Sequence, residues 1–255
     1  MTTHDSDLSD NFASVIRFVA NPSGAVIRYP DRRLSFGWDP PIGTLTVISR
    51  EREPALVEFE TYARWTARFD LVVPAGFASR LTISRDVTDA ARLAFLASWP
   101  SHNLDELSMV ECILGDPAVR HLAGLRGLRY LDLYGTYVTD ESGAVLGGLS
   151  GLEWLSLTET RIGTVGIERL GAMPNLRRLS LRRTAITDNA LVAIAEMPHL
   201  EWLSVADTAV SSYGLEHLLA RAPSLTWVAI NGTPAASSPR TATLPRRPGV
   251  RFFEH

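Results

Sequence analysis

The sequence contains no lysine, so all 25 of its basic residues are arginine. Arginine codons are GC-rich and lysine codons are AT-rich, so this bias indicates a GC-rich bacterial genome. It also limits what one arginine can signal, because arginine is the only strong cation in the chain. With 28 acidic residues the net charge is −3, which gives no global electrostatic reason to expect nucleic acid or an anionic membrane as a partner.

Cysteine and long apolar runs are also scarce. Cys112 is the single cysteine, so no intrachain disulfide can form. No apolar run approaches the ~20 residues that a membrane-spanning helix needs. The opening residues, "MTTHDSDLSDN", are polar and acidic, unlike a secretory signal. We therefore expect a soluble, cytoplasmic protein in which residues 1–10 form a disordered tail.

Sequence motifs typical of metal, cofactor or catalytic sites are missing as well. The six histidines show no metal-ligand spacing. The sequence has no phosphate-binding P-loop, no GxGxxG after a strand and no G-x-S-x-G nucleophile motif. We expect no catalytic residue, no metal and no cofactor.

A 24-residue repeat dominates the second half of the chain. The segment "LRRLSLRRT" (176–184) lies between "LEWLSLTET" (152–160) and "LEWLSVADT" (200–208). The first leucine slots of six copies in register are Leu104, Leu128, Leu152, Leu176, Leu200 and Leu225.

Each copy predicts one strand followed by one helix. In the LxL segment, alternate side chains point to opposite faces, so the leucines point inward. The following segment, such as "DNALVAIAEM" (188–197), has apolar residues at helical spacing, and Asp188 is placed to cap that helix. One strand and one helix cannot bury their own apolar faces, so the copies stack into a solenoid with a parallel sheet on its concave side.

This pattern, LxxLxLxxTxIxDxGLxxLxxLPx, resembles the leucine-rich-repeat family, and its spacing is most similar to the short bacterial GALA-type and cysteine-containing classes. The resemblance covers about residues 104–233 and implies an α/β solenoid. The family's buried Asn or Cys slot implies a polar ladder bonded to the backbone of the adjacent coil. Here that slot holds Cys112, Thr136, Thr160, Thr184, Thr208 and Thr233. Cys112 is therefore interpreted as structural.

The two ends depart from the repeat. Residues 11–86 contain short β-like runs between turns and predict a small β-rich domain, which does not fit the three-helix F-box of ubiquitin-ligase adaptors. The solenoid is expected over 87–233. Residues 234–255 are expected to form an irregular loop and a last strand, in which "PGVRFF" (248–253) copies "PSLTWV" (223–228) at a step of 25.

Repeats in register turn sequence columns into rows of neighbouring side chains on the concave face, about 4.8 Å apart. The outward position before the second leucine slot holds mainly aromatic residues: Glu106, Tyr130, Trp154, Arg178, Trp202, Trp227 and Phe252. The other candidate binding residues on this face are Asp132, Tyr134, Thr158, Arg182 and Asn231. Aromatic rows are enriched at binding surfaces, although the rings could instead stack on one another or be covered by the chain's own ends.

The four arginines of "LRRLSLRRT" have different expected neighbours. Arg177 lies between Glu153 and Glu201, and Arg183 lies between Glu159 and Asp207, so both predict cross-strand ion pairs. Arg178 lies between Trp154 and Trp202, where a guanidinium can stack on both rings. Arg182 has no countercharge in its own column.

Three functional hypotheses follow. The first is a non-catalytic module that binds a protein partner through the aromatic concave face. The second is a binder of a small anionic ligand, or an enzyme, with its site between the concave face and the N-terminal domain and with Arg182 meeting the anion. The third makes the repeats a platform for an activity of the N-terminal domain, with Trp38, Asp39, Trp65 and Arg68 as its first candidates.

Overall fold

The computed structural model describes residues 32–34, 43–49, 61–66, 71–73, 77–243 and 250–253. The predicted tail at 1–10 lies outside these residues, as do Trp38, Asp39 and Arg68 of the third hypothesis.

Ten strands form one continuous sheet in the order β12-β11-β10-β9-β8-β7-β6-β5-β2-β3, and β1 pairs with β4 in a separate ribbon. The first five strands are β1 (Arg32–Leu34), β2 (Gly43–Ser49), β3 (Thr61–Thr66), β4 (Leu71–Val73) and β5 (Phe77–Ile83). The repeat strands are β6 (Glu106–Ser108), β7 (Tyr130–Asp132), β8 (Trp154–Ser156), β9 (Arg178–Ser180), β10 (Trp202–Ser204), β11 (Trp227–Ala229) and β12 (Arg251–Phe253). Pairing is parallel from β5 to β12, whereas β2 is antiparallel to both β5 and β3.

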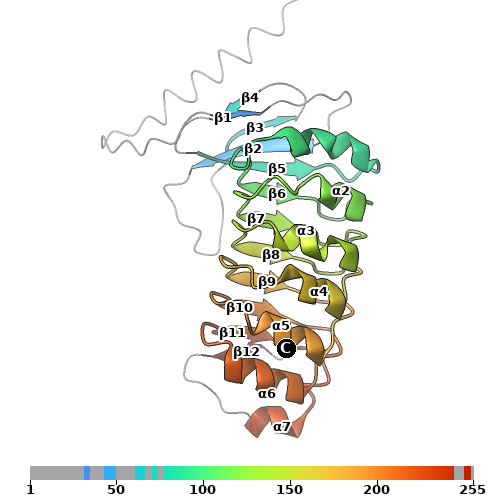
Figure 1. Cartoon of the computed structure of the whole chain (residues 1–255), viewed down its shortest axis with the longest axis vertical. Helices are drawn as coiled ribbons and strands as arrows, with labels where there is room; N and C mark the ends of the chain where they lie inside the picture. The colour runs from blue at the N-terminus through green and yellow to red at the C-terminus, as the bar shows by residue number, and fades with distance from the viewer. Residues whose placement is uncertain are drawn as a thin grey trace, which may run out of the picture.

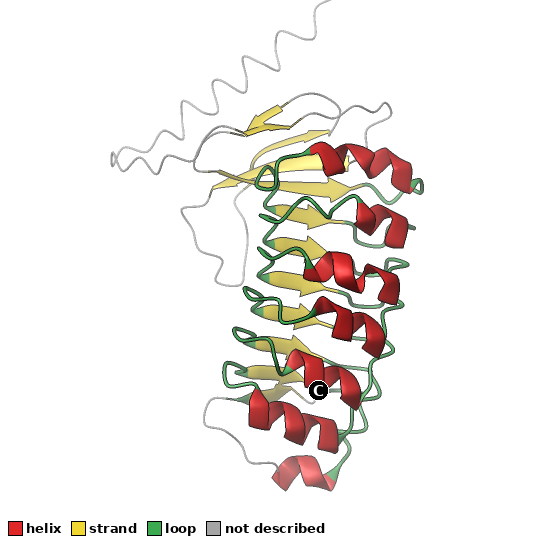
Figure 2. Cartoon of the chain, viewed as in Figure 1, coloured by secondary structure: helices red, strands yellow, loops and turns green. Residues whose placement is uncertain are grey.

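The helices lie along one side of this sheet, so that helix and strand alternate down the length of the molecule (Figures 1 and 2). They are η1 (Ala90–Ser98), α2 (Asp116–Arg120), η2 (Asp140–Ser142), α3 (Gly143–Gly147), α4 (Thr164–Leu170), α5 (Asp188–Ile194), α6 (Ser212–Arg221) and α7 (Pro239–Thr243). The first, η1, is a 3-10 helix near the start of the solenoid predicted over 87–233. The sheet face that turns away from the helices is the predicted concave face.

The core lies between the sheet and the helices. The central leucines of five successive strands are fully buried: Leu107, Leu131, Leu155, Leu179 and Leu203. Each pairs in register with its counterpart one repeat away, as Leu155 does with Leu179. The inward leucine slots read from the period are therefore confirmed.

The polar ladder is also present, with one difference from the expectation. Each of its five threonines donates to the carbonyl oxygen three residues earlier in its own repeat, as Thr184 Oγ1 does to Leu181 O at 2.6 Å, rather than to the adjacent coil. Only Cys112 Sγ reaches the neighbouring coil, where the Ser84 carbonyl oxygen lies 3.6 Å away. The Cys112 side chain is fully buried.

Neighbouring repeats are joined at the helix N-termini by carboxylates. Asp188 accepts hydrogen bonds from Ser211 N (2.7 Å) and Ser211 Oγ (2.6 Å) of the next repeat. Asp140 accepts from Gly163 N at 2.6 Å in the same way. The expectation that Asp188 caps its own helix is wrong, because the N-cap of α5 is Thr187 and no side chain caps that helix.

The N-terminal strands continue the solenoid sheet. β5 supplies Leu81 and Ile83, which are 0% and 2% exposed, to the core shared with the repeats. The predicted domain boundary at 86/87 stays a prediction, since the hydrogen-bonded sheet runs across it through the β5–β6 pair. At the other end, the expected irregular loop contains the short helix α7.

Candidate functional site

The candidate site is a stripe of large side chains that crosses the concave face perpendicular to the strands. We call it the aromatic ridge and define it by one residue from each of five consecutive strands: Tyr130, Trp154, Arg178, Trp202 and Trp227. Strand pairing places these residues directly opposite one another. All five are half-buried, whereas the next residue on each strand is fully buried.

Four of the five ridge residues form two ring stacks. Tyr130 and Trp154 stack with ring centroids 4.0 Å apart and an interplanar angle of 7°. Trp202 and Trp227 stack at 4.7 Å and 9°. The rings thus pack on each other, as the self-packing alternative expected, yet each keeps part of its surface exposed.

Arg178 lies in register between the two stacks. Within the part of the chain that the structure describes, its side chain has no ion pair, no hydrogen bond and no cation–π contact. The expected position between two tryptophans is confirmed, but the expected stacking of the guanidinium on both rings is not observed. The ridge is therefore an aromatic column interrupted by one unpaired cation.

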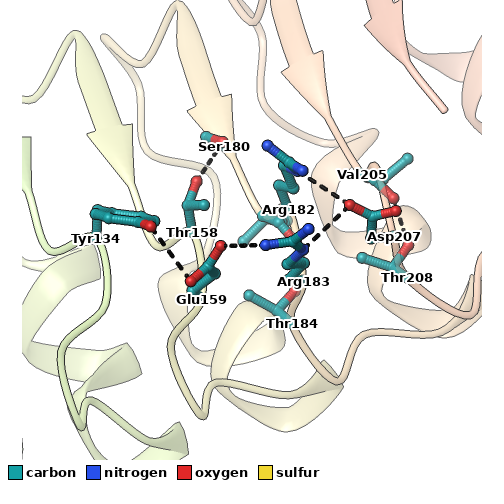
Figure 3. Close-up of polar contacts among 11 residues, drawn as sticks. Tyr134, Thr158, Glu159, Ser180, Arg182, Arg183, Thr184, Val205, Asp207 and Thr208 are labelled. Carbon is teal, nitrogen blue, oxygen red and sulfur yellow. Dashed lines mark hydrogen bonds and ion pairs between the residues drawn. The ribbon is translucent and has the colours of Figure 1, made fainter. Parts of the chain in front are cut away.

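Beside the ridge runs a row of small side chains. Ser156, Ser204 and Ala229 are each at most 5% exposed. The hydroxyls of Ser180 and Thr158 lie 2.7 Å apart (Figure 3). Because these side chains are short, the ridge rings stand above this row.

The N-terminal end of the ridge is closed by charges that pair with each other. Arg80 Nε lies 2.5 Å from Glu106 Oε2, and the Arg80 guanidinium carbon lies 5.6 Å from the ring centroid of Tyr130. Burial raises the pKa of Glu106 even though Arg80 acts to lower it. Sequence reasoning missed Arg80, because β5 and β6 pair at a step of 26 residues rather than 24.

Asp132 lies on β7 two residues after the ridge residue Tyr130, in the row of side chains beside the ridge. Its carboxylate accepts from Tyr134 N at 3.0 Å. Burial raises the pKa of Asp132, although this hydrogen bond acts to lower it.

A charged network follows the ends of the strands (Figure 3). Arg183 Nη1 donates to Glu159 Oε1 at 2.7 Å, and Arg183 Nε lies 3.3 Å from Asp207 Oδ2. The predicted pairing of Arg183 with both neighbours is therefore confirmed. Arg177 pairs with Glu201, while its other predicted partner, Glu153, is held by Arg129 Nε at 2.7 Å.

The interpretation of Arg182 as a cation without a countercharge is wrong. Arg182 Nε donates to Asp207 Oδ2 at 3.0 Å. Asp207 belongs to the adjacent column and the next repeat, so the contact is diagonal. Tyr134 joins the same network, because its hydroxyl donates to Glu159 Oε2 at 3.3 Å, and the charge of Glu159 raises the pKa of Tyr134.

The turn residues of this network have left-handed backbone conformations. Glu159, Arg183 and Asp207 have φ values of 56°, 54° and 55°, and the same column contains Gly135 and Gly232. Non-glycine residues adopt this region at a cost, so the turn geometry fixes where these charges lie.

At the C-terminal end of the ridge, the register of β12 against β11 differs from the predicted register by one residue. Trp227 pairs with Arg251, and Val228 pairs with Phe252. Phe252 therefore packs against the core rather than extending the ridge, because a shift of one residue turns every side chain to the opposite face. The exposed residue that follows Trp227 in the stripe is Arg251, which sequence reasoning missed.

The structure thus places ten of the eleven candidate residues on the concave face and moves Phe252 off it. Tyr134, Thr158, Arg182 and Asn231 occupy the outward position beyond the strands, and each is half-buried. Among the described residues, no group of three or more His, Cys, Asp or Glu side chains could hold a metal ion. None of the described helices has the length and apolar character needed to cross a membrane.

Comparison with known proteins gives similarity of fold only. No family model matches the chain, and no curated protein matches it. Among solved structures, one similar chain is in the crystal structure of the Rad7 and Elc1 complex in yeast, with a TM-score of 0.50 and 21% identity over 68% of this chain and 46% of that one. Another is internalin C2 from Listeria monocytogenes, with a TM-score of 0.48 and 22% identity over 68% and 80% of the two chains.

These neighbours are leucine-rich-repeat proteins. The present chain spans less than half the length of the first. With the parallel strands and the flanking helices, the similarity defines an α/β leucine-rich-repeat solenoid.

Proposed function

We propose that this chain is a non-catalytic recognition module that binds a protein partner through the aromatic ridge. The observation that carries the proposal is that four rings and one guanidinium form a single half-exposed stripe across five strands. Tryptophan, tyrosine and arginine dominate the energetics of protein interfaces. Ring stacking also fixes these side chains before binding, which lowers the entropy cost of association.

The hypothesis of a small anionic ligand has less support. Its anion-binding residue was Arg182, and Asp207 already accepts a hydrogen bond from that guanidinium. The carboxylate or phosphate of a ligand would have to compete with Asp207 for the Arg182 guanidinium.

The test is affinity capture from lysate of the source organism, followed by quantitative mass spectrometry. The bait proteins are the wild type, the double variant Trp154→Ala/Trp202→Ala and the control Tyr213→Ala. Tyr213 is a suitable control because it is an aromatic residue on helix α6 with 67% of its surface exposed.

We expect the wild type and the control to enrich the same protein, and the ridge variant to lose it. Truncating two central interface aromatics typically weakens binding by about 30-fold or more. Equal capture by all three baits would contradict the proposal.

A further inference from the structure

The ridge has a charge asymmetry that points to the chemistry of its partner. On the concave face, Arg80 is paired with Glu106, and Arg182 and Arg183 are paired with Asp207 and Glu159. Arg178 differs from these arginines, because it has no carboxylate partner among the described residues.

We propose that Arg178 binds a carboxylate of an extended peptide segment of the partner, and that apolar side chains on either side of that acid pack on the two ring stacks. This inference rests on the proposed function of the ridge. It adds the partner's chemistry: an acidic residue with an apolar residue two positions before it and another two positions after it.

The first argument is charge complementarity. A half-buried guanidinium between aromatic rings is less well hydrated than one on an open surface, and hydrogen bonds to a carboxylate are among the strongest that it can make. The Ser156 and Ser204 hydroxyls beside the ridge carry no charge to compete for it. The ring stacks on either side of such an ion pair would help to exclude water from it, which strengthens the pair further.

The second argument is spacing. Adjacent ridge positions are about 4.8 Å apart, so the middle of each ring stack lies about 7 Å from Arg178, one and a half strand steps away. In an extended chain, side chains on one face repeat every two residues, which is also about 7 Å. An acid opposite Arg178 therefore places its two flanking apolar residues over the Tyr130/Trp154 stack and the Trp202/Trp227 stack.

The ends of the ridge suggest a direction. Three steps from Arg178 on one side is Arg251, which is exposed and has no ion pair among the described residues. Three steps away on the other side is Glu106, whose charge is already paired. A second acid four positions from the first, about 14 Å in an extended chain, would reach Arg251 and orient the segment toward β12.

The test is selection of peptides from a random seven-residue display library on the full chain. Selection uses the wild type, Arg178→Glu, Trp154→Ala/Trp202→Ala and the control Arg126→Glu. The control makes the same charge change at an exposed arginine outside the sheet. Thermal unfolding of each variant verifies its fold, and Arg178→Glu is expected to unfold near the wild-type temperature because no described ion pair is lost.

We expect the wild type and the control to enrich peptides with a central Asp or Glu between apolar residues at positions −2 and +2. Arg178→Glu should lose these peptides or select a basic centre. A synthetic copy of the best peptide should bind at least tenfold more weakly when its central Glu is replaced by Gln.

Three results would overturn the inference: wild-type peptides without a central acid, the same peptides on Arg178→Glu, or no enrichment at all. If peptides are lost on the tryptophan variant but retained on Arg178→Glu, the ridge remains a binding surface and only the proposed contact between Arg178 and a carboxylate is refuted. If the tryptophan variant also captures the same protein from lysate as the wild type, the proposed function fails as well.

Discussion

Cys112 stands in a column otherwise filled by threonine, and its surroundings disfavour the reactive thiolate form. The side chain is fully buried, and burial raises the pKa of the Cys112 thiol to about 11. At neutral pH the thiol is therefore protonated, which removes the nucleophilic form. Its position was predictable from the period, and so was its structural role.

The shifted pKa of Cys112 gives a pH dependence of stability. Above pH 9 the thiol of the unfolded chain loses its proton, while the folded chain keeps it up to about pH 11. The free energy of unfolding should therefore fall across this interval, by at most ~1.4 kcal/mol per pH unit for one proton. Urea titrations of the wild type and Cys112→Thr from pH 8 to pH 11 measure the effect. A variant with the same pH slope as the wild type would show that Cys112 makes no contribution.

Arg182 shows where residue-level reasoning from the sequence stops. Comparing the same slot in successive repeats correctly paired Arg183 with Glu159 and Asp207. It missed the Arg182–Asp207 contact, because that bond joins two different slots. Side-chain length and turn conformation decide such diagonal contacts, and neither follows from the period.

At the scale of the element, the helix N-termini hold neighbouring repeats together through carboxylates such as Asp188. Replacing Asp188 by Ala leaves Ser211 N and Ser211 Oγ without their acceptor. We expect a loss of about 2 kcal/mol in the free energy of unfolding, typical of hydrogen bonds to a charged group. Asp188→Thr should retain much of the stability, since Thr164 accepts from Thr187 N at the equivalent place, at 3.1 Å. Equal losses in the two variants, measured by urea denaturation, would refute the link.

Gly214 provides an independent check of the same contact. A Cβ atom on Gly214 would lie 2.4 Å from Asp188 Oδ1, so Gly214→Ala should destabilise the protein by about 1–3 kcal/mol, as overpacking does. In the Asp188→Ala background the clash with the carboxylate is removed while the Cβ atom of residue 188, at 2.9 Å, remains, so this cost should fall in part. A double-mutant cycle measures the coupling, and additive effects would argue against the contact.

Element-level prediction failed where the repeat pattern stopped. The ridge positions from Tyr130 to Trp227 follow from the regular steps of 24 and 25, and strand pairing confirms them. Between Thr233 and Val250 no leucine pattern fixes the count, and Phe252 was placed one residue out of register. Asp188, inside a regular repeat, was assigned to its own helix for a different reason: helix capping is a local rule, and this bond joins two repeats.

At the scale of the whole molecule, the solenoid is stabilised by contacts between adjacent repeats. Its two ends each lack one neighbour, so the stability of the whole depends on how the ends are capped. β5 covers the edge of β6 and buries Leu81. We expect the fragment 77–255 to fold cooperatively and the fragment 87–255, which lacks β5, to aggregate or to lose its thermal transition. Circular dichroism and size-exclusion chromatography distinguish these outcomes. A stable, monomeric 87–255 fragment would instead support the predicted boundary at 86/87.

Because the ring pairs stack in register, the number of repeats sets the length of the ridge. Each 24-residue unit adds one step to the ridge, so the surface can be shortened without disturbing its neighbours. Excision of residues 165–188 would join Thr164 to Asn189 and bring Trp154 opposite Trp202. The shortened protein would carry four uninterrupted rings and no Arg178. Insertion or loss of whole units is thus a route by which one scaffold would exchange the proposed carboxylate-binding ridge for a purely apolar one.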